Sequence, residues 1–365
     1  MQIGTILSSL EEWAHPSLQE SYDNSGLITG NSQWNCKGVL VTLDATEEVI
    51  LEAVNRGCNL IIAHHPIVFK GLKSLTGKNY IERAVITAIK EDIAIYALHT
   101  NLDNILKGVN AAIALKIGLE DSRILVAKPL QLKKLYTFVP VADAEKVRAA
   151  LFTAGGGTIG NYSEASFTTN GIGTFKPETG ANPTIGSVGI REQVNEKKLE
   201  VIFPAWLQND MITALKNAHP YEEVAYDIVS LDNDLQEVGS GLLGVLPEPI
   251  TENAFLQLLK ERFGLKVIRH TTFTQKQIQK VAICGGAGSF LIGRALAAGA
   301  DAYVTADVKY HEFFDAEGRM LLADIGHWES EQFTIELIRD FLKEKFPTFA
   351  VLKTGVKTNP VEYFG

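Results

Sequence analysis

Short apolar runs alternate with helical repeats along the first third of the chain. The segments 38–44 (GVLVTLD), 59–65 (NLIIAHH) and 93–99 (IAIYALH) are almost continuously apolar, which is typical of buried strands in a parallel sheet. Between the first two, TEEVILEAVNRG has helical spacing, starts with Thr46 as a cap and stops at Gly57. Strict alternation of strands and helices predicts a parallel sheet covered by helices.

The last third of the chain repeats this plan. Strand patterns at 280–288, 300–308 and 320–326 alternate with helical patterns at 289–299 and 330–346. EAVNRGCNLIIAHH also resembles RALAAGADAYVTAD, and the four-residue spacing of His99 and Asp103 recurs in His327 and Glu331. A duplicated α/β unit would place two sites face to face across a pseudo-twofold axis. Unrelated strand–helix units also look alike at this level, so both interpretations stay open.

The middle of the chain has a different pattern. From about Leu130 to Leu231 the order is strand, helix, strand, hairpin, strand, helix, strand, which predicts a ferredoxin-like unit. AKPLQLKK and DNDLQEVGSG would be the hinges on either side of it. The expected fold is therefore a two-part α/β core with largely parallel sheets, residues 1–129 and 234–365, and an inserted ferredoxin-like α+β domain, residues 130–233.

Composition narrows the class of protein. The chain has 365 residues, 46% hydrophobic and 21% charged, as expected for a globular protein with a full core. The net charge of −9 argues against nucleic-acid binding over the whole surface but leaves room for a local basic patch. Three widely spaced cysteines without a CxxC pair favour buried thiols over metal ligands. The chain lacks an apolar run long enough for a membrane span or a signal peptide, so we expect no membrane contact and a cytoplasmic location.

Two adjacent histidines give the sharpest chemical signal. His64 and His65 end a buried strand and are followed by Pro66. Successive side chains of a regular strand point to opposite faces, so both could reach one ion only if a turn at Pro66 swings them inward. Alternatively, each could serve a different ion of a dinuclear site with metals about 3.5–4 Å apart. A lone buried histidine is usually a core residue, but a pair at a strand end favours metal ligands.

Further candidate ligands lie at other strand ends. His327 and Glu331 are four residues apart at the start of a helix, where both face the same way. The HxxxE pattern is common by chance. It is informative here because it lies at a strand end in the other half of the α/β core. Asp103 adds a carboxylate that could bridge two ions. Three imidazoles and two carboxylates suit divalent Zn, Fe, Mn, Co or Ni.

Other polar residues have two readings each. His99, His311, Asp23, Asp44 and Asp307 lie at strand ends or loops, where they could orient ligands or carry protons, or have only structural roles. The CGGAGS turn at 284–289 could cradle a phosphate or could be a close-packing turn.

Six motifs resemble the Nif-three-like dinuclear metal-centre family, also labelled GTP cyclohydrolase type-two-like. They occur in the family's order: YDNSGLITG (22–30), IIAHHP (61–66), LHTNLD (98–103), CGGAGS (284–289), ADAYVTADVKYH (300–311) and DIGHWESE (324–331). The resemblance implies that His64, His65, Asp103, His327 and Glu331 hold two metal ions. One departure is Ala306, where many relatives have glycine.

The resemblance extends to the insert and to assembly. GNYSEASF and NAHPYEEVAYDI resemble the domain related to signalling PII and copper-tolerance (CutA) proteins that longer family members carry. The family also implies a toroidal homohexamer whose metal sites face a central cavity.

Two functions from different classes follow. The leading hypothesis is a metal-dependent hydrolase that attacks a nucleotide or phosphorylated small molecule with metal-activated water, and in which His99 or His311 carries protons. The alternative is a regulatory or scaffold ring, in which the PII-like insert binds a ligand or partner and the metals are mainly structural. A third hypothesis, nucleic-acid binding through the cavity of such a ring, is disfavoured by the net charge. It would require basic residues such as Lys70, Lys73, Lys78 and Lys309 to gather inside that cavity.

Overall fold

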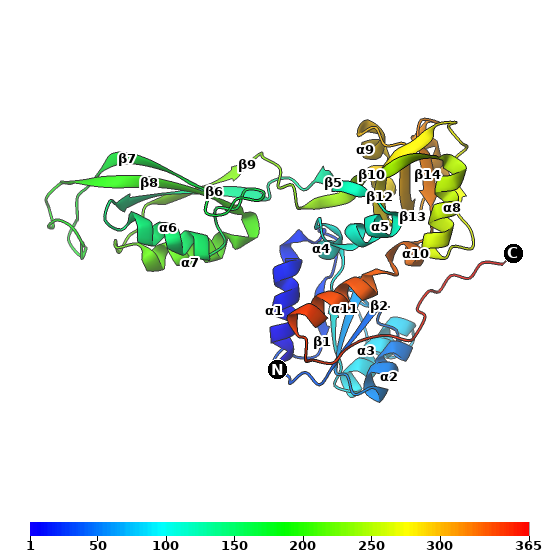
Figure 1. Ribbon diagram of the computed structural model, residues 1–365. Coiled ribbons are helices and arrows are strands. Elements are labelled where there is room, and N and C mark those ends of the chain that lie inside the picture. Colours follow the sequence, from blue (N-terminus) through cyan, green and yellow to red (C-terminus); the bar gives the residue numbers. More distant parts are fainter. Residues whose placement is uncertain (365) are drawn as a thin grey trace. The chain divides into compact units, whose positions relative to one another are not determined.

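The computed structural model of the protein describes residues 1–364 and divides them into two compact units (Figure 1). The first combines residues 1–127 with the segment from 237 to the end of the described chain, and the second is 128–236. Among the described helices, none is both long and apolar enough to cross a bilayer.

The first sheet of the larger unit is mostly parallel. Its order is β1-β4-β3-β2-β15, and β1 is antiparallel to its neighbour β4. The strands are β1 (Gly26–Thr29), β2 (Val39–Asp44), β3 (Leu60–His65), β4 (Ala94–Ala97) and β15 (Val351–Lys353).

Helices cover both faces of this sheet. On one face, α2 (Glu47–Asn55) and α3 (Tyr80–Lys90) share a buried cluster that includes Leu40, Ile50 and Ala84. On the other, α1 (Ile3–Trp13) meets α11 (Thr334–Lys345), and the rings of Trp13 and Phe341 stack 4.2 Å apart (Figure 1). The predicted Thr46 cap is confirmed, because its side chain accepts a hydrogen bond from the Val49 N–H.

The second sheet is mixed. Its order is β11-β14-β13-β12-β10-β5, and only β12, β13 and β14 are mutually parallel. The strands are β5 (Glu120–Ala127), β10 (Gly239–Thr251), β11 (Arg269–His270), β12 (Gln277–Ala287), β13 (Ala302–Ala306) and β14 (Leu321–Asp324). Its helices are α5 (Val109–Ile117), α8 (Glu252–Phe263), α9 (Ile292–Ala297) and α10 (His327–Glu331). The α/β class is therefore confirmed, with parallel pairing dominant in the first sheet only.

Each sheet takes a strand from the other end of the sequence. β15, near the C-terminus, pairs with β2, and β5, from the N-terminal part, pairs with β10. The two sheets thus do not coincide with the two sequence halves. A strand pattern records burial and alternation but not the identity of the partner strand.

The smaller unit has one four-stranded antiparallel sheet. Its order is β7-β8-β6-β9, and along the chain the elements run strand, helix, strand, strand, helix, strand, as in a ferredoxin-like unit. They are β6 (Leu132–Pro140), α6 (Ala144–Thr153), β7 (Ser166–Phe175), β8 (Glu192–Pro204), α7 (Gln208–Ala218) and β9 (Tyr226–Leu231). Both helices lie on one face of the sheet (Figure 1), where Leu199, Val201 and Phe203 join them in the core.

A buried glutamate fastens the loop that precedes α3. Glu82 is 3% exposed and accepts hydrogen bonds from the side chains of Ser74, Thr76 and Asn79 and from the backbone N–H groups of Thr76 and Lys78. The backbone hydrogen bond from Thr76 is the largest contribution, and together these donors lower the pKa of Glu82 from 4.5 to about 2.

We expect Glu82→Gln to reduce the free energy of unfolding at neutral pH. Because the pKa of Glu82 is depressed in the folded state, its contribution is complete above the ordinary value of 4.5 and is lost as the pH falls toward 2. Urea denaturation at several pH values would therefore show a wild-type-minus-variant difference that shrinks in acid. A difference of equal size at neutral pH and at about pH 3 would contradict this role for the carboxylate.

Candidate metal centre

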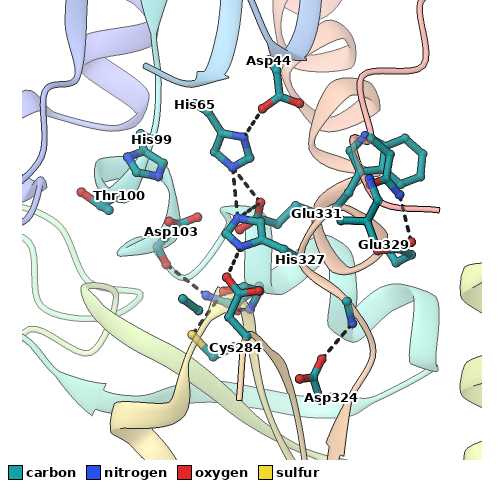
Figure 2. A pocket seen from close by; sticks show the side chains of 18 of the residues that line it. Asp44, His65, His99, Thr100, Asp103, Cys284, Asp324, His327, Glu329 and Glu331 are labelled. Atoms are coloured by element: carbon teal, nitrogen blue, oxygen red, sulfur yellow. Dashed lines mark hydrogen bonds and ion pairs between the residues drawn. The ribbon is translucent and has the colours of Figure 1, made fainter. Parts of the chain in front are cut away.

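Five predicted ligands converge at the carboxyl ends of strands. His64 and His65 end β3, Asp103 ends the short helix α4 (Thr100–Asp103) after β4, and His327 and Glu331 delimit α10 after β14. Figure 2 shows His65, Asp103, His327 and Glu331 turned toward one space. Their contacts bring side chains from both sheets together, as expected where strand ends meet in an open α/β fold.

Glu331 is the hub of this cluster. Its Oε2 lies 2.9 Å from His65 Nε2 and 3.2 Å from His327 Nε2, while its Oε1 lies 3.8 Å from His64 Nε2. Asp103 Oδ1 lies 3.6 Å from the same His64 nitrogen. The adjacent histidines therefore both face the centre, but they meet different oxygens of one carboxylate.

A second set of groups fixes each imidazole. His64 Nδ1 donates to the Leu98 carbonyl oxygen at 2.9 Å, so in the neutral ring its Nε2 carries the lone pair. His65 Nδ1 lies 2.8 Å from Asp44 Oδ1, and His327 Nδ1 lies 2.7 Å from Asp307 Oδ2. Holding a histidine by Nδ1 is the usual way in which proteins aim Nε2 at a metal ion.

The cluster fits a divalent metal ion. The Nε2 atom of His64 is fully buried and has no hydrogen-bond partner among the described residues. A buried nitrogen lone pair facing two carboxylates is unfavourable unless a cation or donor lies between them. One ligand atom each from His64, His65 and Glu331 fall within 4.8 Å of one another, and this nitrogen and oxygen set is borderline in hardness.

Electrostatics reinforce this fit. Burial raises the pKa of Glu331, but His327, His64 and His65 outweigh burial and hold it well below its ordinary value. Burial alone would lower the pKa of both His65 and His327. Asp44 and Glu331 instead raise the pKa of His65 to about 10, and Glu331 and Asp307 raise that of His327 to about 11. The site thus strongly favours positive charge around Glu331, which a metal ion would supply while displacing protons.

The centre opens into a cavity of about 920 Å³ with apolar walls. Tyr22, Phe69 and Trp328 line it, as do four residues near the C-terminal end of the described chain: Asn359, Pro360, Val361 and Tyr363. Arg269 is the only lysine or arginine of the described chain that lines this cavity, and it donates to Asp324 Oδ2 and the Val308 carbonyl oxygen.

The glycine turn of CGGAGS packs closely and is not open to a phosphate at its first two glycines. Gly285 N–H donates to Asn110 Oδ1, and Gly286 N–H donates to Ser330 Oγ. Gly286 has a φ of +60°, and a Cβ built there would lie 2.3 Å from Glu331 Oε1. Of the two readings, the structure favours the packing turn.

The two proposed proton carriers lie in different surroundings. His99 lines the cavity, and its Nδ1 lies 2.7 Å from Asp23 Oδ1. His311 is exposed on η4 (Tyr310–Ala316), where its ring lies 5.1 Å from that of Tyr310, and it does not line the cavity. The structure therefore brings His99 beside the candidate metal ligands and leaves His311 outside the cavity.

The sequence did not identify the partners of three aspartates, and it gave no sign that Thr358 supports one of them. Asp23, Asp44 and Asp307 bind His99, His65 and His327, respectively. Asp44 Oδ2 also accepts a hydrogen bond from Thr358 Oγ1 at 2.6 Å, a contact across 314 residues that has no local signal. The expectation for the cysteines is confirmed, because Cys36, Cys58 and Cys284 are buried and unpaired.

Comparisons with known proteins agree over almost the whole chain. A family model described as Duf34/NIF3 (NGG1p interacting factor 3) matches residues 1–360. A Halalkalibacterium halodurans protein named GTP cyclohydrolase 1 type 2 homolog is 40% identical over 365 residues, covering 98% of each chain. A Bacillus subtilis protein of that name is 39% identical over 325 residues, covering 88% of this chain and 87% of that one. The solved structure of a Bacillus cereus protein related to NIF3 has a TM-score of 0.89 at 37% identity, covering 100% of this chain and 99% of that one.

Proposed function

The chain belongs to the Duf34/NIF3 family, and from this premise we propose that it is a hydrolase-type protein dependent on two divalent metal ions. Its substrate would be a nucleotide or a phosphorylated small molecule. The name of its relatives, GTP cyclohydrolase 1 type 2 homolog, supports a nucleotide. The observation that carries the proposal is the buried Nε2 of His64, which has no hydrogen-bond partner among residues 1–364 and faces Asp103 and Glu331.

Glu331 divides the proposed ligands into two groups. Its Oε1 faces His64, near Asp103, and its Oε2 faces His65 and His327. One carboxylate could therefore serve two ions, which accounts for two adjacent histidines that meet different oxygens. Divalent ions in such a site lower the pKa of water and polarise the bond under attack.

Residues around the proposed metal ligands would orient the imidazoles and transfer protons. Asp44 and Asp307 hold two of the imidazoles in their productive tautomer. His99, fixed by Asp23 and beside Asp103 in Figure 2, is the proposed proton carrier. The apolar walls of the cavity would limit the access of bulk water to the reacting groups.

Assembly into a ring of six copies is also part of the proposal. Phe290, Tyr310 and Phe314 are 66%, 72% and 66% exposed, and the last two rings lie 5.8 Å apart. Exposed aromatic side chains that gather in this way mark contact surfaces between proteins.

Metal-dependent turnover tests the proposed activity. We expect protein stripped by a chelator to regain hydrolysis of GTP, or of another member of a nucleotide and phosphoester panel, when a divalent metal is restored. His65→Ala should lower this rate at least about 100-fold, since loss of even an outer partner of a metal ligand lowers affinity or activity 10–100-fold. His270→Ala, a change at an exposed histidine outside the cavity, is the matched control.

Two outcomes would count against the proposal. A metal-loaded His65→Ala variant as active as wild type would remove the assigned centre. A metal-replete wild type that turns over nothing in the panel would instead favour a regulatory or scaffold protein.

A further inference from the structure

A second cavity, of about 770 Å³, lies entirely within the smaller unit. Its floor is the sheet face that α6 and α7 leave open. Phe138 and Lys198, which are directly paired across β6 and β8, line it, whereas Leu199 next in sequence points into the helix-covered core. This cavity is therefore separate from the metal centre and is built from other elements.

The loop between β7 and β8 forms a fixed wall of this cavity. Asn182 N–H donates to Glu222 Oε1 at 2.8 Å, and Thr184 Oγ1 donates to the Pro220 carbonyl oxygen at 2.8 Å. These contacts tie the loop to the segment between α7 and β9, whose residues form the opposite wall. The two walls of the cavity are therefore joined by hydrogen bonds.

Glu196 is the exceptional side chain of this cavity. It is only 7% exposed, and its Oε1 accepts a hydrogen bond from the Tyr221 hydroxyl at 2.8 Å. Tyr221 is the one hydrogen-bond donor to this carboxylate among the described residues, and none of their lysines, arginines or histidines forms an ion pair with it. The neighbouring strand leaves room for it, since a Cβ at Gly173 would lie 2.0 Å from Oε2.

The nearby lysines are turned to other partners. Lys198 Nζ lies 3.0 Å from Glu200 Oε1 and 4.3 Å from the ring centre of Tyr136. Lys176 Nζ lies 3.3 Å from Glu178 Oε1. The lining contains these two lysines and four glutamates, so it repels anions and attracts cations. The glutamates are Glu178, Glu196, Glu222 and Glu223.

A flat apolar group would find complementary surfaces beside this carboxylate. The rings of Phe175 and Tyr221 lie 5.7 Å apart, and Phe138 adds a third ring to the lining. Aromatic walls around a buried carboxylate suit a ligand with a ring and a charged nitrogen. The carboxylate has no cationic partner among the described residues, so a ligand cation would add a charge-assisted hydrogen bond.

We infer that this cavity is a binding site for a small organic cation with a flat apolar body, whose N–H groups donate to Glu196. Amidines, guanidines and aromatic amines share this chemistry. The site lies outside the proposed reaction centre, so it would operate whether or not that centre is a hydrolase.

Benzamidine is a suitable probe, and benzamide is its neutral counterpart of the same shape. Isothermal titration calorimetry with the full chain should show benzamidine binding at least about tenfold tighter than benzamide, as expected for one charge-assisted hydrogen bond. Glu196→Gln should remove this preference and keep the bond from Tyr221, because the amide oxygen still accepts it. Asp232→Asn, a change at an exposed acid of the same unit outside the cavity, should retain the preference.

A second variant guards against misfolding of the first. Gly171 lines the cavity and pairs with Glu196 across β7 and β8, and a Cβ there meets no atom within 4 Å. Gly171→Val should therefore narrow the site beside Glu196 and weaken benzamidine binding at least about tenfold without unfolding the unit. His65→Ala should leave the binding unchanged, since the metal centre is elsewhere. Equal affinities for the two probes, no binding of benzamidine to wild type, or a preference that survives in Glu196→Gln would overturn the inference.

Discussion

Glu331→Gln is expected to leave a folded protein that no longer retains metal. Glutamine keeps the size of the side chain and one acceptor oxygen, but it removes the negative charge that faces His64, His65 and His327. Because Glu331 is 3% exposed, bulk water cannot replace that charge. We expect the dissociation constant for a divalent ion to rise at least about 100-fold, more than for loss of an outer partner.

Metal content after dialysis and competition with a chromogenic chelator would measure this effect. The matched control is Glu329→Gln on the same helix, whose carboxylate accepts a hydrogen bond from Asn359 and lies outside the ligand cluster. Circular dichroism should be that of wild type in both variants. If Glu331→Gln held as much metal as wild type against the same chelator, Glu331 would not be the central ligand.

Gly286→Ala is expected to damage both the fold and the metal site. The φ of +60° at this position is one that alanine adopts only with strain, and the added Cβ would lie 2.3 Å from Glu331 Oε1. The carboxylate or the turn must then move. We expect the free energy of unfolding to fall by about 1–3 kcal/mol and metal affinity to fall at least about tenfold.

Urea denaturation of the metal-free protein and chelator competition separate these two effects. Gly293→Ala is the matched control, because a Cβ there meets no atom within 4 Å and alanine favours the helix α9 by up to about 1 kcal/mol. That control should be as stable as wild type or more so. A Gly286→Ala variant with unchanged stability and unchanged metal affinity would show that the close approach to Glu331 is unimportant.

The sequence was informative wherever a feature is local. The period of apolar residues located β2, α2 and β3, and Thr46 could be recognised as a cap because its partner Val49 is three residues away. The candidate ligands could be found because strand ends meet at one edge of such a fold.

Long-range pairing was beyond the sequence pattern. The exchange of β5 and β15 between sheets depends on partners more than a hundred residues away. The antiparallel strands β10 and β5 made the second sheet mixed, although each has an ordinary strand pattern. His99 and His311 could not be told apart either, since only the fold decides which one reaches the cavity.

The pairing of β15 with β2 bears on how the chain matures during translation. The ribosome makes the N-terminal strands first, but the outer edge of β2 stays unpaired until Val351–Lys353 has been made. Asp44 likewise lacks its hydrogen bond from Thr358 until that residue has been made. Until β15 is available, the chain carries an open strand edge on β2, a feature that promotes aggregation. Completion of this sheet, and of the contact that Thr358 makes with Asp44 beside the candidate metal site, therefore comes after β1 to β4 have been made, and a chain cut upstream of β15 would keep the open edge.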